Sequence, residues 1–338
     1  MTESHPLVSI CIPTYNRASM VHEAIRSAID QSYENLEILV VDNASSDNIR
    51  EVVESFQDSR LSLIVNEKNL GLFGNFNRCI ELARGKYINI LHSDDAIDSR
   101  FTQTCVEFLE SHPSVVMTFT AAEVISGGTT KSLKMSDNNL IFSAPEGFRK
   151  ILLTRNFIVC PSVMVRREVY EQVGYFSMEY PFSSDYYQWL TISRQFDVAY
   201  VAGANVLYHQ GDHSESFRLQ FTSPAGYLDT QKIYLQILLD LGDNRTQYIT
   251  ELNAAFYTFI RDCLFAGFTR SDHMRAGNAG IFWGISLGVW GLIQPRSFVS
   301  IIKKGLYLLI IISSGLLMQV ALIRMVVRKL LSGRTNLY

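Results

Sequence analysis

The sequence of 338 residues has few cysteines, and it lacks the opening segment that is typical of an exported protein. Its five cysteines are odd in number, widely spaced and mostly embedded in apolar runs, so they indicate neither a disulfide framework nor a zinc site. The first ten residues contain no basic segment followed by an apolar one, which predicts that no signal peptide is present. Both observations favour a body that stays in the reducing cytoplasm.

Three kinds of binding feature are also missing. No G-x-G-x-x-G follows the first predicted strand and no G-x-x-x-x-G-K-[ST] occurs anywhere, so dinucleotide oxidoreductases and P-loop kinases fit poorly. The acidic body of the chain offers no basic face of the kind that binds nucleic acid. Nucleic acid is therefore excluded as a partner.

Acidic residues are absent from the C-terminal tail. All 33 lie at or before Asp272, whereas eight of the 30 Lys and Arg residues follow it. The tail holds a glycine-rich uncharged stretch at 276–295 and a more apolar stretch at 305–323, close to the roughly 20 residues that cross a bilayer. Basic residues flank the second stretch on both sides, so a helix lying in an anionic interface fits as well as a spanning one. Membrane association is the favoured prediction, and a buried helical hairpin is the remaining alternative.

The first third of the chain alternates between two hydrophobic periods. Continuous apolar runs indicate buried strands, and apolar residues on one helical face indicate the helices between them. Five strands are predicted, at 7–12, 36–41, 61–65, 87–91 and 115–119. Four helices are predicted, around 20–29, 49–56, 76–83 and 101–109. This alternation predicts an α/β fold with a mostly parallel central sheet that is flanked by helices on both faces.

The pattern loosens beyond residue 142. Five further elements are predicted, namely strands at 159–165, 198–201 and 206–208, a short helix between the first of these strands and a turn at Gly174, and a helix that begins near 183. A helical segment from residue 223 then leads to the tail. We therefore predict an α/β domain at 1–217 and a C-terminal helical region at 218–338, whose hydrophobic, basic, membrane-associating segment lies at about 276–331.

Polar clusters follow four of the predicted strands, and ligands of a parallel sheet bind beyond the carboxyl ends of its strands. The clusters stand at 13–17, 42–47, 66–71 and 92–95. The last contains the adjacent acids Asp94 and Asp95, whose like charges repel each other. The pair either caps the next helix or binds a divalent cation such as Mg²⁺, which takes one or two protein carboxylates together with phosphate oxygens and would remove the repulsion.

Four sequence blocks, in this order and spacing, resemble the family 2 glycosyltransferases of GT-A fold. They are VSICIPTYNR, EILVVDNASSD, NLGLFGNFNRCIELARGKYINILHSDD and GYFSMEYPFSSDYYQWL. The resemblance implies the GT-A fold for the first domain. It also implies transfer of a sugar from a nucleotide-diphosphate sugar to a hydroxyl, with inversion at the anomeric carbon and usually with Mg²⁺ or Mn²⁺.

The resemblance further implies a donor site at the first two polar clusters. The residues that match it are Pro13, Thr14, Tyr15, Asn16, Asp42, Asn43 and Ser45. Asn43 stands where the family has the second acid of a pair near the base. This departure leaves a UDP-sugar and a dTDP-sugar as alternative donors.

The third block carries the match to the D-x-D metal motif, with Ser93 in place of its first acid. The resemblance makes Asp95 the expected metal ligand, and it makes Asp94 the expected partner of the donor's ribose or sugar. Phe76 stands where the family often has an arginine, so we expect that arginine contact to be absent.

Asp185 matches the family's general base, which takes the proton of the acceptor hydroxyl. Trp189 follows one helical turn later, and it is predicted to form a platform for the acceptor, with a core aromatic as the equal alternative. The family often places a histidine near the diphosphate or metal, and here both His209 and His213 are available. His213 matches slightly better and is the predicted metal ligand, while a solvated loop histidine is the alternative.

The leading hypothesis is a hexosyl- or deoxyhexosyltransferase on the cytoplasmic side of the cell membrane. It would act on a glycan or lipid-linked acceptor in the synthesis of a cell-surface polysaccharide or glycolipid. One alternative is a non-catalytic nucleotide-sugar-binding scaffold of a membrane glycan assembly complex, although the acids Asp94, Asp95 and Asp185 argue for activity. Another is a sugar-phosphate nucleotidyltransferase, but the PTYNRAS segment lacks the glycine-rich, basic loop of that class.

Overall fold

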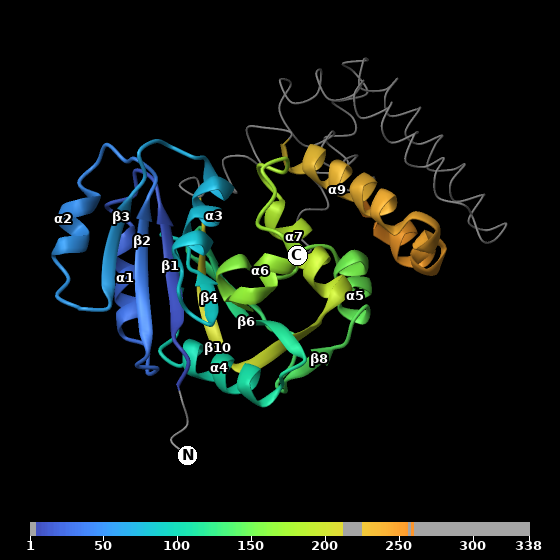
Figure 1. The fold of residues 1–338 in the computed structure, drawn as a ribbon, viewed down its shortest axis with the longest axis horizontal. Coiled ribbons are helices and arrows are strands. Elements are labelled where there is room, and N and C mark those ends of the chain that lie inside the picture. The colour runs from blue at the N-terminus through green and yellow to red at the C-terminus, as the bar shows by residue number, and fades with distance from the viewer. Residues whose placement is uncertain (1–4, 212–224, 256–257, 260–338) are drawn as a thin grey trace. The chain divides into compact units, whose positions relative to one another are not determined.

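The computed structural model describes residues 5–211, 225–255 and 258–259. By the contacts within the chain, two compact units are distinguished, Met1–Arg218 and Leu219–Tyr338. The first unit is built around one ten-stranded sheet (Figure 1). Eight of its strands lie side by side in the order β3-β2-β1-β4-β9-β6-β10-β5, and the other two, β7 and β8, pair with β6 and β10. The polar clusters of the site lie at the ends of these strands.

One half of the sheet is parallel, as the alternation of strands and helices predicts. Its strands are β1 (Val8–Thr14), β2 (Leu36–Asp42), β3 (Leu61–Val65) and β4 (Tyr87–Ile90). The helices that connect and follow them are α1 (Val21–Ile29), α2 (Ile49–Glu54), α3 (Leu72–Leu82) and α4 (Phe101–Ser111). These predicted elements are confirmed, because each apolar run or stripe is long enough to fix one element.

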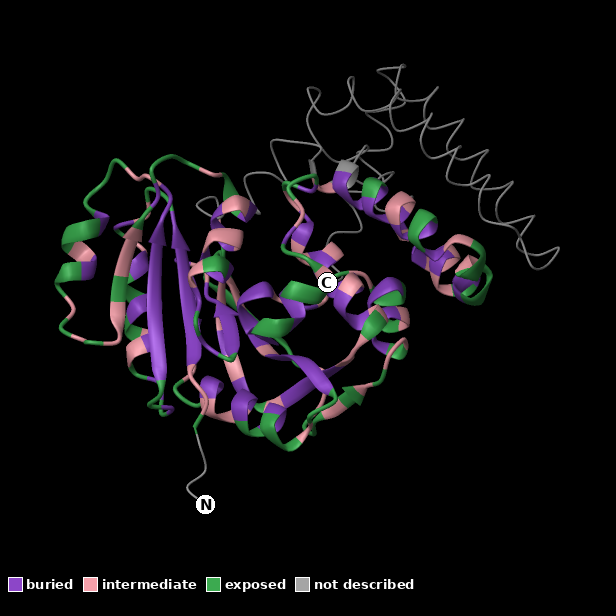
Figure 2. Ribbon diagram, viewed as in Figure 1, coloured by how far each residue is buried: buried purple, intermediate pink, exposed green. Residues whose placement is uncertain are grey.

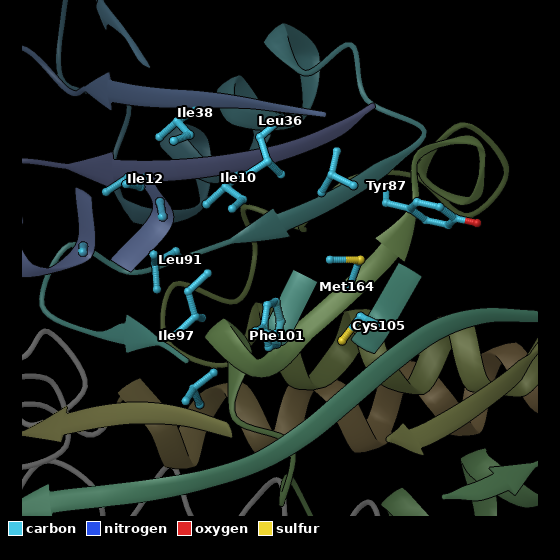
Figure 3. Close-up of a cluster of buried hydrophobic side chains, with 14 of the residues drawn as sticks. Ile10, Ile12, Leu36, Ile38, Tyr87, Leu91, Ile97, Phe101, Cys105 and Met164 are labelled. Carbon is cyan, nitrogen blue, oxygen red and sulfur yellow. The ribbon is translucent and has the colours of Figure 1, made fainter. Parts of the chain in front are cut away.

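Helices cover this half of the sheet on both faces. Ile10 and Ile12 of β1 belong to the same buried cluster as residues of α1 and α4 (Figure 3). Cys11, which points to the opposite face, donates from its thiol to the Cys79 carbonyl in α3 over 3.7 Å. Figure 2 accordingly shows β1 and β2 as buried along their lengths, while α2 exposes its outer side.

The other half of the sheet is mixed, which corrects the prediction of a mostly parallel sheet. The strand β9 (Val163–Arg166) runs antiparallel between β4 and β6 (Val115–Ser126), and β5 (Ala96–Ile97) is antiparallel to β10 (Asp197–Gln210). The short strands β7 (Thr129–Leu133) and β8 (Leu140–Phe142) are also antiparallel to their partners. The reason is tertiary: Asn89 in β4 donates to the carbonyls of Pro161 and Val163 over 2.9 and 2.8 Å, and this holds the returning chain against β4.

The remaining elements of the first unit are α5 (Glu146–Thr154), the short 3₁₀ helix η1 (Cys160–Ser162), α6 (Arg167–Val173) and α7 (Ser184–Gln195). The predicted helix near 183 is thus confirmed as α7. The two short strands predicted at 198–201 and 206–208 form the single strand β10, which pairs with β6 across an irregularity between Tyr200 and Asn205.

The described part of the second unit consists of α9 (Ala225–Leu241), the 3₁₀ helix η2 (Gly242–Tyr248) and helical residues that follow it. Among the residues that the structure describes, no helix is both long and apolar enough to cross a membrane. The predicted membrane-associating segment at 276–331 lies outside the described residues.

Candidate active site

Hydrogen bonds tie together the loops that follow β1 and β2. The backbone N–H of Asn16 donates to Ser45 Oγ, and the N–H of Ser46 donates to Asn16 Oδ1, each over 2.8 Å. The N–H of Asn43 donates to the Thr14 carbonyl over 2.9 Å. The predicted donor-site residues of these two loops are therefore brought together on one surface.

Tyr15 is the aromatic side chain of this surface, and 45% of it is exposed. Its neighbour Asn16 and, in the second loop, Ala44 both adopt left-handed backbone, with φ of 51° and 62°. Such conformations are uncommon outside glycine and cluster at functional sites. Pro13 and Thr14 are buried in β1, so Tyr15 is the member of the first loop that is open to stack on a base.

Asp42 is buried at the end of β2, where its carboxylate holds the turn that follows. Ser45 Oγ donates a short hydrogen bond to Asp42 Oδ1, and the Ser45 N–H lies 3.2 and 3.3 Å from Oδ1 and Oδ2. Such side-chain bonds to the backbone two or three residues on stabilise tight turns. A carboxylate has about four acceptor sites, so this turn leaves Asp42 capacity for a further donor.

Asn43 directly follows Asp42 and is buried. Its side chain forms hydrogen bonds with residues 66–71, the loop that follows β3.

The adjacent acids occupy different surroundings. Arg17 Nη1 lies 2.6 Å from Asp94 Oδ2, and the two side chains are 18% and 9% exposed. Asp95 is fully buried, and the short strand β5 that follows it pairs with β10. This pairing brings the His209 N–H within 2.7 Å of Asp95 Oδ1.

His92 packs beside Asp95, with its Nδ1 3.2 Å from Asp95 Oδ2. Burial lowers the pKa of His92, but its hydrogen bonds with the Asp95 carboxylate and the Cys160 thiol outweigh burial and hold that pKa well above its ordinary value. For Asp95, burial is the largest effect and raises the pKa, against the opposing hydrogen bond from His92. Each of the two groups thus shifts the pKa of the other toward its charged form, while burial acts in the opposite direction on both.

One possible cation site involves His92, Asp94 and Asp95, whose ligand atoms all lie within 4.8 Å of one another. Apart from His92 Nδ1 at 3.2 Å, Asp95 Oδ2 has no polar partner among the described residues, and carboxylate oxygens are the protein ligands that Mg²⁺ and Mn²⁺ prefer. These residues therefore fit a hard divalent cation. His209 Nδ1 is 4.0 Å from Asp95 Oδ1, whereas His213, the predicted ligand, lies outside the described residues.

Asp185 lies in the first turn of α7 and is held by two hydrogen bonds. Asn156 Nδ2 donates to Asp185 Oδ2 over 3.0 Å, and the Tyr186 N–H donates to Oδ1 over 2.7 Å. Burial raises the pKa of Asp185, while these two bonds and the nearby His92 act in the opposite direction. A raised pKa suits a carboxylate that must accept a proton near neutral pH.

Cys160 is the common neighbour of the two acidic centres. Burial raises the pKa of its thiol, His92 opposes this effect, and the charges of Asp185 and Asp95 add to it. The structure therefore brings Asp95, His92 and Asp185 into one electrostatic neighbourhood.

Two side chains near the site are core residues. Trp189 is 1% exposed and packs edge to face on Phe176 at 5.9 Å, so its burial contradicts the predicted acceptor platform and supports the core alternative. Phe76 is also buried, and its ring lies 5.6 Å from that of His92. The position that often carries an arginine in the family thus packs against the imidazole here.

Sequence reasoning missed Arg17, His92, Asn156 and Cys160. Arg17 stands in the first polar cluster, so its position after a strand was a usable signal. Asn156 follows α5 and reaches Asp185 across 29 positions of sequence, and no motif in the sequence marks that contact.

The fold and the site define an α/β protein with an acidic site at the ends of its strands, and comparison with known proteins gives the family. The model of the family "Glycosyl transferase family 2" matches residues 9–174. The chain is 32% identical over 197 residues to the UDP-Glc:alpha-D-GlcNAc-diphosphoundecaprenol beta-1,3-glucosyltransferase WfgD of Escherichia coli, covering 57% of this chain and 72% of WfgD. It is 28% identical over 204 residues to the putative teichuronic acid biosynthesis glycosyltransferase TuaG of Bacillus subtilis, covering 59% of this chain and 77% of TuaG.

The fold is similar to that of S. aureus TarS 1-349 in complex with UDP-GlcNAc, with a TM-score of 0.59 and 20% identity over 72% of this chain and 70% of that one. The chain belongs to glycosyl transferase family 2, and it is a glycosyltransferase with a GT-A-like fold. The resemblance inferred from the four sequence blocks is confirmed. Family membership also argues against a non-catalytic scaffold.

Proposed function

We propose that this glycosyltransferase moves a sugar from a UDP- or dTDP-sugar to a hydroxyl of a lipid-linked or other glycan acceptor. The observation that carries the proposal is the position of His92, which contacts Asp95 and whose charge opposes the rise that burial causes in the pKa of Asp185. The expected metal ligand and the candidate base therefore lie around one imidazole. The product would be a cell-surface polysaccharide or glycolipid.

Relatives support the choice of substrates. The TarS structure contains UDP-GlcNAc, and the name of WfgD specifies a UDP-Glc donor and a GlcNAc-diphosphoundecaprenol acceptor. TuaG is named for teichuronic acid biosynthesis. The TarS and WfgD descriptions support a nucleotide-diphosphate sugar as the donor class, and the WfgD name supports a lipid-linked glycan as the acceptor class.

Direct displacement with inversion suits a single carboxylate base. In this reaction the acceptor oxygen bonds to the anomeric carbon, the bond from that carbon to the diphosphate breaks, and Asp185 takes the hydroxyl proton. Asn156 and the Tyr186 N–H orient the Asp185 carboxylate for that step. In the donor site, Tyr15 would stack on the nucleobase of the donor, and Asp42 would accept a hydrogen bond from that nucleobase.

Mg²⁺ or Mn²⁺ is the proposed cofactor, with Asp95 as its ligand and with Asp94, His92, His209 and His213 as its neighbours or further ligands. When bound, the cation would neutralise the negative charge of the departing diphosphate. The role of the chain is to hold the Asp95 carboxylate in place through the hydrogen bond from the His209 N–H, while the adjacent His92 opposes the rise that burial causes in the pKa of Asp95.

A screen of nucleotide sugars by thermal shift tests the donor and the metal together. We expect one UDP- or dTDP-sugar to raise the melting temperature in the presence of Mn²⁺ or Mg²⁺, and we expect EDTA to remove most of that rise. Asp95→Asn should abolish the metal-dependent part, whereas the exposed substitution Glu54→Gln should leave it intact. The proposal would be contradicted by a chain that no nucleotide sugar stabilises.

Attachment to the cytoplasmic face of the membrane is proposed from the sequence of the tail, which is basic and free of acidic residues after Asp272. Flotation of the full chain with vesicles tests it. We expect recovery with anionic phosphatidylglycerol vesicles, and the salt sensitivity of that recovery separates surface binding from insertion. A full chain that stays at the bottom of the gradient with every vesicle would refute the attachment.

A further inference from the structure

The side chain of Asn43 joins the end of β2 to the loop at 66–71. Its Nδ2 donates to Asn69 Oδ1 over 2.9 Å and to the Gly71 carbonyl over 3.2 Å. Its Oδ1 accepts from the Leu70 N–H over 2.8 Å and from Asn66 Nδ2 over 3.1 Å. A carboxamide has two N–H donors and two acceptor lone pairs. All four hydrogen-bonding positions of Asn43 are therefore taken up by this loop.

Backbone partners fix the orientation of the amide. The Leu70 N–H can only donate and the Gly71 carbonyl can only accept, so the Asn43 oxygen must face Leu70 and its nitrogen must face Gly71. An aspartate could accept both bonds but could donate neither. Its second oxygen would instead face Asn69 Oδ1 and the Gly71 carbonyl, two acceptors that repel it.

The connection continues into the core. Asn66 Nδ2 also donates to Asn75 Oδ1 over 2.8 Å, and Asn75 Nδ2 donates to the Val41 carbonyl in β2 over 2.9 Å. Asn66 and Asn75 are both buried. Buried amides with every group paired hold one arrangement, because each broken bond would leave an unpaired polar group away from water.

The anchored loop lies beside the proposed nucleotide site. Asn43 directly follows Asp42, and the Asn66 N–H donates to the Asp42 carbonyl over 2.8 Å. The Asn43 N–H donates to the carbonyl of Thr14, the last residue of β1. The loop at 66–71 is thus joined to the loop at 42–47, which is in turn joined to the loop at 13–17.

We propose that Asn43 is a positioning residue for the nucleotide site: it fixes the loop at 66–71 through its saturated amide and makes no hydrogen bond to the base. This rests on the proposed use of a nucleotide-sugar donor. It also explains why an amide stands where the resemblance places an acid, because only an amide both donates to and accepts from this loop.

Asn43→Asp separates this role from direct contact with the base. If Asn43 positions the loop, the variant should bind UDP and dTDP roughly tenfold more weakly in calorimetry, with a raised KM for the donor and with kcat changed by less than about threefold. If instead Asn43 Oδ1 accepted a hydrogen bond from the nucleobase, the aspartate of the variant would still supply that acceptor, now with a full negative charge, and binding would not weaken. Unchanged or tighter binding by Asn43→Asp would therefore overturn the proposal.

Hydrogen exchange supplies a readout that needs no nucleotide. Amides of residues 66–71 should exchange roughly tenfold faster in Asn43→Asp than in the wild type. The matched control is Asn35→Asp at the opposite end of β2, where an exposed amide donates to the His5 carbonyl over 2.7 Å. It makes the same chemical change and should leave both exchange of this loop and nucleotide binding unaltered.

Asn69→Ala keeps the test decisive if Asn43→Asp does not fold. It removes the oxygen that accepts from Asn43 and from the Gly71 N–H, and it should raise exchange in the loop and weaken nucleotide binding severalfold. Wild-type exchange and affinity in Asn69→Ala would overturn the proposal. A wild-type chain that binds neither nucleotide would contradict the proposed function alone, since the exchange comparison still tests Asn43.

Discussion

The guanidinium of Arg17 lies 2.6 Å from the carboxylate of Asp94, and both side chains are largely buried. The sequence suggested that a bound cation relieves the repulsion between Asp94 and Asp95. In the structure an arginine already neutralises the first acid, and His92 stands beside the second. The protein itself therefore keeps both acids in place.

A double-mutant cycle between Arg17 and Asp94 tests this pairing. Arg17→Gln should lower the free energy of unfolding because it leaves the Asp94 carboxylate uncompensated, and adding Asp94→Asn should restore part of the loss. We expect a coupling energy of about 1–3 kcal/mol from denaturant unfolding. Arg50 and Glu54, which are 65% and 62% exposed at 3.4 Å, provide the control pair with an expected coupling below about 0.5 kcal/mol. Equal coupling energies in the two pairs would contradict the claim that Arg17 compensates the charge of Asp94.

The raised pKa of Asp185 predicts the pH dependence of transfer. Because the base must be ionised, kcat/KM should fall as the pH is lowered through this pKa, at a higher pH than the ordinary carboxyl value of about 3.9. Initial rates over a pH series measure it. A rate that stays level down to the ordinary carboxyl range would show that no group with a raised pKa acts as the base.

The same shift predicts a stability effect with a definite sign. A carboxyl whose pKa is raised by folding contributes stability below its unfolded pKa, and that contribution is lost as the pH rises through the folded pKa. Asp185→Asn should therefore raise the free energy of unfolding at neutral pH, and the difference should shrink in acid. Chemical denaturation of both proteins at two pH values decides this, and a destabilised Asp185→Asn at neutral pH would count against the shift.

The pKa of Glu37 is shifted in the opposite direction from that of Asp185, and Glu37 lies at the start of β2, away from the site. Burial alone would raise its pKa, but hydrogen bonds from Ser9 and Arg84 outweigh burial and lower it. Its contribution is present above the unfolded pKa and lost as the pH falls through the folded pKa. Glu37→Gln should lower the free energy of unfolding by about 1–3 kcal/mol at neutral pH, less in acid, and should leave kcat unchanged. A loss that is the same at both pH values would refute the ionic origin of the effect.

Local pattern decided what the sequence predicted well. The apolar runs of β1 and β2 and the stripe of α1 needed no tertiary information, and the polar clusters that follow those two strands do lie together in the structure. The reversal of β9 was not predictable, because Asn89 fixes it by contacts with residues more than 70 positions away. The acceptor platform predicted at Trp189 differs from the structure for a related reason. Helical spacing tells on which side of α7 the Trp189 side chain lies, but it does not tell which neighbouring residues cover that side chain.

Amides and charges at the site were hidden for a different reason. Asn43 could be read as a donor-site residue because its position follows a strand, but only the four partners in the structure show that its amide is fully used. His92 stands in the polar cluster at 92–95, but its role depends on the separate approaches of Asp95 and Cys160, which the sequence does not show.

The most direct test of the proposed reaction compares donor binding with sugar transfer in Asp185→Asn. With the donor identified by the thermal-shift screen, binding is measured by calorimetry and transfer by incorporation of labelled sugar into a lipid-linked glycan acceptor. We predict that the variant binds the donor within about threefold of the wild type and that transfer falls roughly 10²- to 10⁴-fold, the usual contribution of a general base. Transfer at the wild-type rate in Asp185→Asn would contradict the account.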